Sequence, residues 1–201
     1  MLRPIPGEPS CYHRPAVVYP IGQTPRGNLI RISDTWPSWN LYQATMTQNA
    51  TTNPYGASDA MKLVESVAND DHTVYNASNP FLVVKNQWYQ FQVWAKAAER
   101  SKFSIFQDGS SFTSAAAWYD LAGGSVGGTQ AQAIARIAAG PNSWYLCQLV
   151  APCTTTSALC YMAIALGLNG GYDETYLGNG ASGAYFYRAT VQVINPTFMF
   201  L

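Results

Sequence analysis

The sequence predicts an all-β protein, built as an antiparallel two-sheet β-sandwich, and three observations support this class. Aromatic residues make up 13% of the chain, with 13 Tyr and 6 Trp, and such residues are enriched in strands. From residue 28 onward, short β-forming runs alternate with turn clusters, as they do in sandwiches. One run, 88–97, alternates apolar and polar residues with the period of two that a strand requires.

The first segment, residues 1–28, is expected to be an extended proline-rich arm. It holds half of the 12 prolines, and each proline removes a backbone donor and favours extended geometry in the residue before it. Residues 194–201 form an apolar tail. Because ordering a segment costs backbone entropy, we expect both ends to lie against another subunit or their own domain. The candidate assembly residues are Arg3, Arg14, Tyr19, Arg26, Phe198, Phe200 and Leu201.

Residues 29–193, between the arm and the tail, are expected to form the sandwich. The predicted strands lie in the runs "NLIRIS", "LYQATMTQ", "DAMKLVES", "HTVYNAS", "QWYQFQVWAKA", "KFSIF", "AAWYDL", "SWYLCQLVA", "LCYMAIALG" and "GAYFYRATVQV". Two segments, 57–67 and 129–140, have helical potential. The second could also be a strand that directs Ile134 and Ile137 inward.

The run 88–97 places two tryptophans on a face that is otherwise polar. Its odd positions form an apolar stripe that is expected to face the core. Its even positions are Trp88, Gln90, Gln92, Trp94 and Lys96. Exposed rings could stack on a sugar while the neighbouring polar groups bind its hydroxyls. Alternatively, this face could pack beneath a loop, a second sheet or another subunit. Further candidate rings for a sugar are Trp36 and Trp39.

The charge balance argues against nucleic acid and membranes as partners. The chain has 11 Lys and Arg against 11 Asp and Glu, a formal net charge of zero, so no broad positive field attracts a polyanion or an anionic lipid surface. No leader-like apolar run and no membrane-length apolar run is visible in the sequence.

No constellation of catalytic residues is evident, and we expect a protein that is not an enzyme and needs no cofactor. The two histidines, His13 and His72, are far apart in the sequence and have no partner motif. The four cysteines lack zinc-binding spacing and are expected to remain free thiols. Adjacent acidic residues at 70–71 and 173–174 leave calcium as the one metal alternative.

Six motifs follow one another between residues 28 and about 193. They are "NLIRISDTW", "NPYGASDAMKLVES", "WYQFQVWAKAAER", "WYDLAGGSVG", "NSWYLCQLV" and "YLGNGASGAYFYRATV". In this order they resemble the carbohydrate-binding-module-like jelly-roll domains of tailed-bacteriophage virion proteins. The chain departs from that family pattern at Tyr187, Arg188 and Thr190, where tryptophan, glycine and glutamine are usual.

The resemblance implies a jelly-roll sandwich that belongs to a phage virion and is assembled in the bacterial cytoplasm. We expect a capsid decoration or cement protein that binds the head surface as an oligomer, such as a homo-trimer, with the major capsid protein as its partner. The alternative is a glycan-binding accessory or tail-fibre protein whose surface tryptophans bind host surface polysaccharide. A shared fold does not decide between them.

Overall fold

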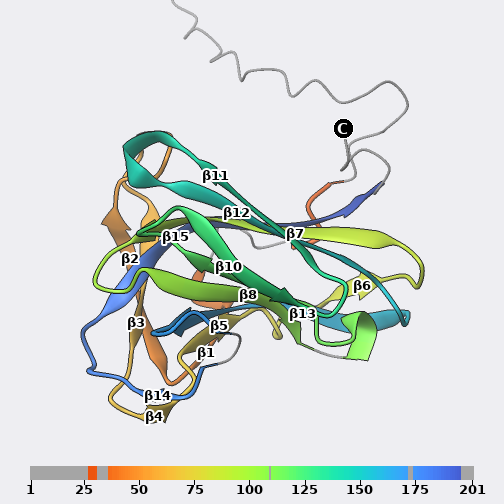
Figure 1. Ribbon diagram of the computed structural model, residues 1–201, viewed down its shortest axis with the longest axis horizontal. Coiled ribbons are helices and arrows are strands. Elements are labelled where there is room, and N and C mark those ends of the chain that lie inside the picture. Colours follow the sequence, from red (N-terminus) through yellow and green to blue (C-terminus); the bar gives the residue numbers. More distant parts are fainter. Residues whose placement is uncertain (1–26, 31–35, 109, 172–173, 196–201) are drawn as a thin grey trace, which may run out of the picture.

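The computed structural model describes residues 27–30, 36–108, 110–171 and 174–195. These residues form two large antiparallel sheets that pack face to face around one main apolar core, which confirms the predicted all-β sandwich (Figure 1). The proline-rich segment 1–26 and the tail from residue 196 lie outside the described residues. So do all seven candidate assembly residues: Arg3, Arg14, Tyr19, Arg26, Phe198, Phe200 and Leu201.

Sheet A has the strand order β1–β5–β13–β8–β9–β10, and β6 also pairs with β13. Its strands are β1 (Asn40–Tyr42), β5 (Thr73–Tyr75), β6 (Phe81–Val83), β8 (Lys102–Asp108), β9 (Ala116–Asp120), β10 (Ser125–Gln130) and β13 (Ser157–Gly167). Among the described residues, three short 3-10 turns accompany the strands of the two sheets: η1 (Trp36–Ser38), η2 (Ser110–Phe112) and η3 (Pro141–Ser143).

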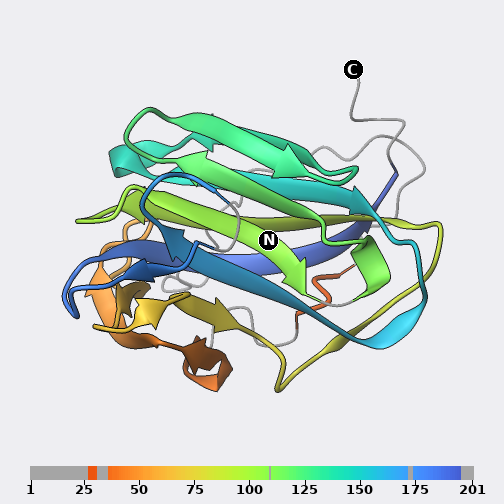
Figure 2. The same cartoon turned by 60° about the horizontal axis from the view of Figure 1, so that its bottom comes forward.

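Sheet B has the strand order β11–β12–β7–β15–β3–β2. Its strands are β2 (Ala44–Thr51), β3 (Ala60–Glu65), β7 (Trp88–Ala97), β11 (Ile134–Ala139), β12 (Tyr145–Pro152) and β15 (Gly183–Ile194). The long β15, drawn in blue, runs the length of the sandwich beside β7 (Figure 2). A small third sheet pairs β4 (Asn69–Asp70) with β14 (Tyr176–Leu177) at one end of the molecule.

Both segments with helical potential are strands in the structure. Segment 57–67 contains β3, and segment 129–140 contains β11. Ile137 packs against the main core, whereas Ile134 lies opposite Val150 on the outer face. The prediction that both isoleucines point inward is therefore wrong, because residues three apart in a strand face opposite sides of the sheet.

The alternation in β7 is confirmed by its burial. Tyr89, Phe91, Val93 and Ala95 are all 1% exposed or less and belong to the main core. Each removes apolar surface from water, and burial of such a side chain contributes roughly 1.5–3 kcal/mol. The even positions are half-buried on the opposite, outer face of sheet B.

Trp36 and Trp39 lie in the core. Trp36 is the first residue of the short turn η1, and Trp39 follows directly after the turn. They are 1% and 4% exposed, and their ring centroids are 4.8 Å apart. A buried ring offers no face to a ligand, so the prediction of these two tryptophans as sugar-binding residues is wrong.

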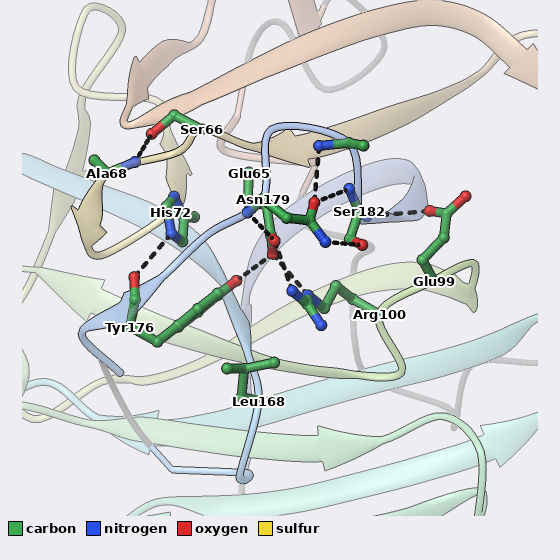
Figure 3. A network of polar contacts seen from close by, with 12 residues as sticks. Glu65, Ser66, Ala68, His72, Glu99, Arg100, Leu168, Tyr176, Asn179 and Ser182 are labelled. Atoms are coloured by element: carbon green, nitrogen blue, oxygen red, sulfur yellow. Dashed lines mark hydrogen bonds and ion pairs between the residues drawn. The ribbon is translucent and has the colours of Figure 1, made fainter.

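A buried ion pair between Glu65 and Arg100 accepts a hydrogen bond from Tyr176 of β14 and so links the small third sheet to the sandwich (Figure 3). Glu65, at the end of β3, is 1% exposed. The Nε and Nη2 atoms of Arg100 donate to its two oxygens, each at 2.6 Å. The Tyr176 hydroxyl donates to Glu65 at 2.9 Å, and the Asn179 backbone N–H donates at 2.8 Å. Nearby, the buried His72 ring lies between two backbone carbonyl oxygens.

These contacts predict that the fold weakens in acid. Burial raises the pKa of Glu65, but hydrogen bonds led by that of Arg100 outweigh burial and hold the pKa below its ordinary value. For Glu174, burial likewise raises the pKa, and backbone N–H groups in the 168–171 loop lower it further than burial raises it. A carboxyl whose pKa is lowered by folding stabilises the fold above its unfolded-state pKa. This contribution is lost as the pH falls through the folded-state pKa.

We therefore expect the free energy of unfolding to decrease as the pH falls below about 4.3, the ordinary pKa of Glu. Urea denaturation between pH 7 and pH 3 measures this decrease, and Glu174→Gln should make it smaller. A free energy of unfolding that stays constant over this range would contradict the expectation.

Candidate functional site

The outer face of sheet B brings the even-numbered residues of β7 together with side chains from β12 and β15. Opposite residues of neighbouring strands point to the same side of a sheet, so the pairing defines continuous rows across the three strands. In order along β7, the rows are Tyr185–Lys96, Tyr187–Trp94–Leu146, Thr190–Gln92–Gln148, Gln192–Gln90–Val150 and Ile194–Trp88–Pro152. All five residues predicted from β7 therefore lie on one surface over the neighbouring strands β12, β7 and β15, whose ribbons Figure 1 shows.

Four aromatic residues, Tyr55, Trp94, Tyr185 and Tyr187, form what we call the aromatic platform at one end of this face. Tyr55 is 68% exposed, and its ring stands edge-on to Trp94, with the ring centroids 6.1 Å apart and an interplanar angle of 82°. It stands similarly against Tyr187, at 6.1 Å and 63°. Trp94 and Tyr185 are half-buried. Tyr187 is buried, with 9% exposure, so the platform combines one projecting ring and two half-buried rings with a buried ring that packs against them.

Two loops hold the aromatic platform from below. Trp144 is fully buried beside Trp94 and Tyr187, and its indole N–H donates to the Thr52 carbonyl at 3.1 Å. The buried Asn53 side chain accepts hydrogen bonds from the Tyr55 N–H at 2.7 Å and from a second backbone N–H in the same loop. These bonds fix the turn that presents Tyr55, so its position does not depend on a ligand.

Gly140 leaves room for the Trp94 ring. A Cβ atom at this position would lie 2.4 Å from Trp94 Cζ3 and 3.2 Å from the Trp144 carbonyl oxygen. We expect Gly140→Ala to displace the indole, to shift the tryptophan emission maximum and to cost about 1–3 kcal/mol of stability. Gly123→Ala is the matched control, because its Cβ would meet Ser125 at an ordinary 3.4 Å. Identical emission spectra for both variants would contradict this account.

Four glutamines form two hydrogen-bonded pairs next to the aromatic platform. Gln148 Nε2 donates to Gln92 Oε1 at 3.0 Å, and Gln192 Nε2 donates to Gln90 Oε1 at 2.6 Å. A side-chain amide carries two donor hydrogens and two acceptor lone pairs. Each pair therefore fixes the orientation of its amides and retains capacity to bind hydroxyl groups.

Trp88 lies at the far end of the face and does not join the aromatic platform. It is six residues from Trp94, a separation of roughly 20 Å along a strand, and its row contains Pro152 and Ile194. The structure therefore separates the two tryptophans that the sequence pattern grouped together.

Sequence reasoning missed the partners that complete the face. Tyr55 lies in the stretch "NPYG", between two predicted strands and without a strand pattern of its own, and Tyr187 is marked in the sequence only as a departure from the family pattern. Gln148 and Gln192 show the same period-two alternation as β7. That alternation could have placed them on an outer face, but which strands are neighbours follows only from the fold.

The described residues do not assemble a calcium site at either acidic pair. Both oxygens of Glu174 accept hydrogen bonds from backbone N–H groups in 168–171, and Asp173 is outside the described part of the chain. Asp70 accepts the Tyr42 hydroxyl, and Asp71 accepts the Thr175 hydroxyl. Within the described ranges, no group of three or more His, Cys, Asp or Glu side chains could hold a metal ion. The three cysteines in these ranges, Cys147, Cys153 and Cys160, are free and buried.

No family model and no curated protein matches the chain. Among solved structures, it is similar to the enzymatically active domain of bacteriophage CBA120 tailspike protein 4, with a TM-score of 0.45 and 17% sequence identity. The likeness covers 83% of this chain and 21% of that chain, so this protein spans about a fifth of its length. The comparisons do not confirm the resemblance to carbohydrate-binding-module-like domains.

The prediction that the protein is not an enzyme is withdrawn. The similar tailspike chain is described as an enzymatically active domain, and this finding overturns the prediction. At a TM-score of 0.45 the likeness assigns no reaction to this chain. In the described part of the chain, no helix has the length and apolar character needed to span a membrane.

Proposed function

We propose that the protein is a phage virion protein that binds a surface polysaccharide of the bacterial host through the outer face of sheet B. The observation that carries this proposal is the aromatic platform, held in place by its loops and bordered by paired glutamines on the same face. The resemblance of six sequence motifs to phage virion domains supports the location on a virion.

The geometry suits a sugar chain because a pyranose ring has both apolar and polar edges. Its C–H face can cover an aromatic ring and bury apolar area, and its hydroxyls can exchange hydrogen bonds with side-chain amides. Trp94 and Tyr55 provide the apolar contacts, and Gln92 and Gln148 provide the polar ones. Pre-formed positions reduce the entropy that a flexible ligand has to lose on binding.

Among the two functions expected from the sequence, the described residues favour the alternative. The capsid decoration hypothesis depends on the arm 1–28 and the tail 194–201, most of which lies outside the described residues. The glycan-binding hypothesis depends on β7, and there the predicted Trp94, Gln90 and Gln92 lie on one face together with further aromatic and amide partners. We therefore propose a tail-associated, receptor-binding role in place of a role as capsid cement.

A titration with purified bacterial capsular and O-antigen polysaccharides tests the proposal. We expect at least one polysaccharide to shift the tryptophan emission to shorter wavelength in a saturable manner, because a bound sugar removes water from Trp94. Assay of reducing ends in the same samples detects hydrolysis that accompanies binding. If no polysaccharide from the bacterial host changes the emission, and none is retained by the immobilised protein, the proposal is wrong.

A further inference from the structure

The charges of sheet B are strongly one-sided although the whole chain has a formal net charge of zero. The six strands of this sheet contain one acidic residue, Glu65. That residue is buried and paired with Arg100. The same strands contain four basic residues: Lys62, Lys96, Arg136 and Arg188. The cations of a neutral protein are therefore concentrated on the sheet that carries the aromatic platform.

Three of the basic residues lie close to rings of the aromatic platform. Lys62 Nζ is 5.9 Å from the centroid of the Tyr185 ring, and the Arg188 guanidinium carbon is 5.7 Å from that of Tyr187. Lys96 is directly opposite Tyr185 on β7 and two residues from Trp94. A ligand on the rings would therefore lie close to cationic groups.

Arg136 extends the positive charge to the glutamine rows. It is exposed on β11 and pairs in register with Gln148, whose amide is bonded to Gln92. A ligand that runs from the rings across the glutamines would therefore approach Arg136 next.

Two acidic side chains at this end of the face are already paired within the protein. Glu99 forms an ion pair with Lys62 at 2.7 Å, and Asp59 accepts a hydrogen bond from Asn53 in the loop beneath Tyr55. Within the described ranges, Lys96 forms no salt bridge with an acidic residue. The face thus retains positive charge at the point where the sugar chain would meet Trp94.

We infer that this face selects acidic polysaccharides, in which uronate carboxylates alternate with sugar faces that stack on the rings. The inference rests on the proposed function and adds the class of ligand to it. Each carboxylate adds a favourable interaction with Lys96 or its neighbours, whereas a neutral chain of the same shape retains only the stacking and the hydroxyl contacts. Exposed charge interactions are screened by salt, with a Debye length of about 10 Å at 0.1 M and about 3 Å at 1 M.

The test uses a panel of uronate-containing capsular polysaccharides, each in its native form and in a carboxyl-reduced form that converts uronates to neutral sugars. At low ionic strength we expect the native form of a bound polysaccharide to bind about tenfold more tightly than its reduced form. In 1 M NaCl the two forms should bind with similar affinity. The reduced form keeps the sugar faces and hydroxyls, so it is a matched control for charge alone.

Two single substitutions test whether the preference for acidic polysaccharides arises on the outer face of sheet B. Lys96→Gln should weaken binding of the native polysaccharide about threefold, the range of one exposed charge pair, and weaken binding of the reduced form by less. Lys102→Gln, on β8 of sheet A, should change neither. Equal binding of the native and reduced forms would overturn the acidic-ligand inference and leave the proposed function intact. Absence of binding to any polysaccharide, charged or neutral, would overturn both.

Discussion

Arg100→Met is expected to lower the free energy of unfolding by about 3–5 kcal/mol, the cost of leaving a buried charge without its partner. The Glu65 side chain is 0% exposed and receives two of its four hydrogen bonds from Arg100. Methionine fills similar space but donates no hydrogen bond. The Tyr176 hydroxyl and the Asn179 N–H remain, and they cannot neutralise the carboxylate.

Urea denaturation at pH 7 measures this cost, with Lys62→Met as the matched control. Lys62 also forms an ion pair, with Glu99, but the Glu99 side chain is 54% exposed. An exposed pair contributes about 0.2–1 kcal/mol. Glu65→Gln in combination with Arg100→Met should recover part of the loss, because it removes the buried charge. Equal effects of Arg100→Met and Lys62→Met would show that burial of the Glu65 pair does not matter for stability.

Trp94→Ala is expected to reduce affinity for the bound polysaccharide at least tenfold. Burying a large apolar side chain contributes roughly 1.5–3 kcal/mol, and 1.4 kcal/mol corresponds to a factor of ten in affinity. Trp94 also positions the exposed ring of Tyr55 through their edge contact. The substitution therefore removes the indole surface of Trp94 and leaves the Tyr55 ring with less support.

Trp118→Ala is the matched control for this variant. Trp118 is also half-buried on a strand, β9, but it belongs to sheet A, where its ring lies against Gly127 and Gly128. We expect the Trp118→Ala variant to bind the polysaccharide with an affinity within about twofold of that of the wild type, a difference of about 0.4 kcal/mol. Thermal denaturation of both variants separates loss of binding from loss of fold. Stronger loss of binding in Trp118→Ala would place the site on sheet A.

The sequence was sufficient for those features that depend on local alternation. In β7 the apolar odd positions, Tyr89 to Ala95, had to face the core because successive side chains of a strand point to opposite faces. This rule assigned Trp94, Gln90 and Gln92 to one surface without knowledge of any neighbouring strand. The same rule places Ile134 on the outer face of sheet B when Ile137 faces the core.

Features that depend on distant parts of the chain could not be predicted in this way. Tyr55 reaches Trp94 through a loop whose path is fixed by Asn53 and by the Trp144 indole. Gln192 meets Gln90 across 102 residues. Such contacts follow from strand order, which alternation within one strand does not encode.

The burial of the tryptophans in and next to the short turn η1 also could not be predicted. The turn η1 has only three residues, too few for a periodic pattern, so composition alone could not distinguish a buried Trp36 from an exposed one.

The central claim, that sugar binds over Trp94 on sheet B, is tested most directly by NMR of the tryptophan indole N–H groups. The six tryptophans of the chain can be assigned by single substitutions and followed during titration with an oligosaccharide of the bound polysaccharide. We expect the Trp94 signal to shift most, with smaller changes at Trp144 beneath it and none at Trp36 or Trp118. A shift at Trp118 with Trp94 unchanged would contradict the claim.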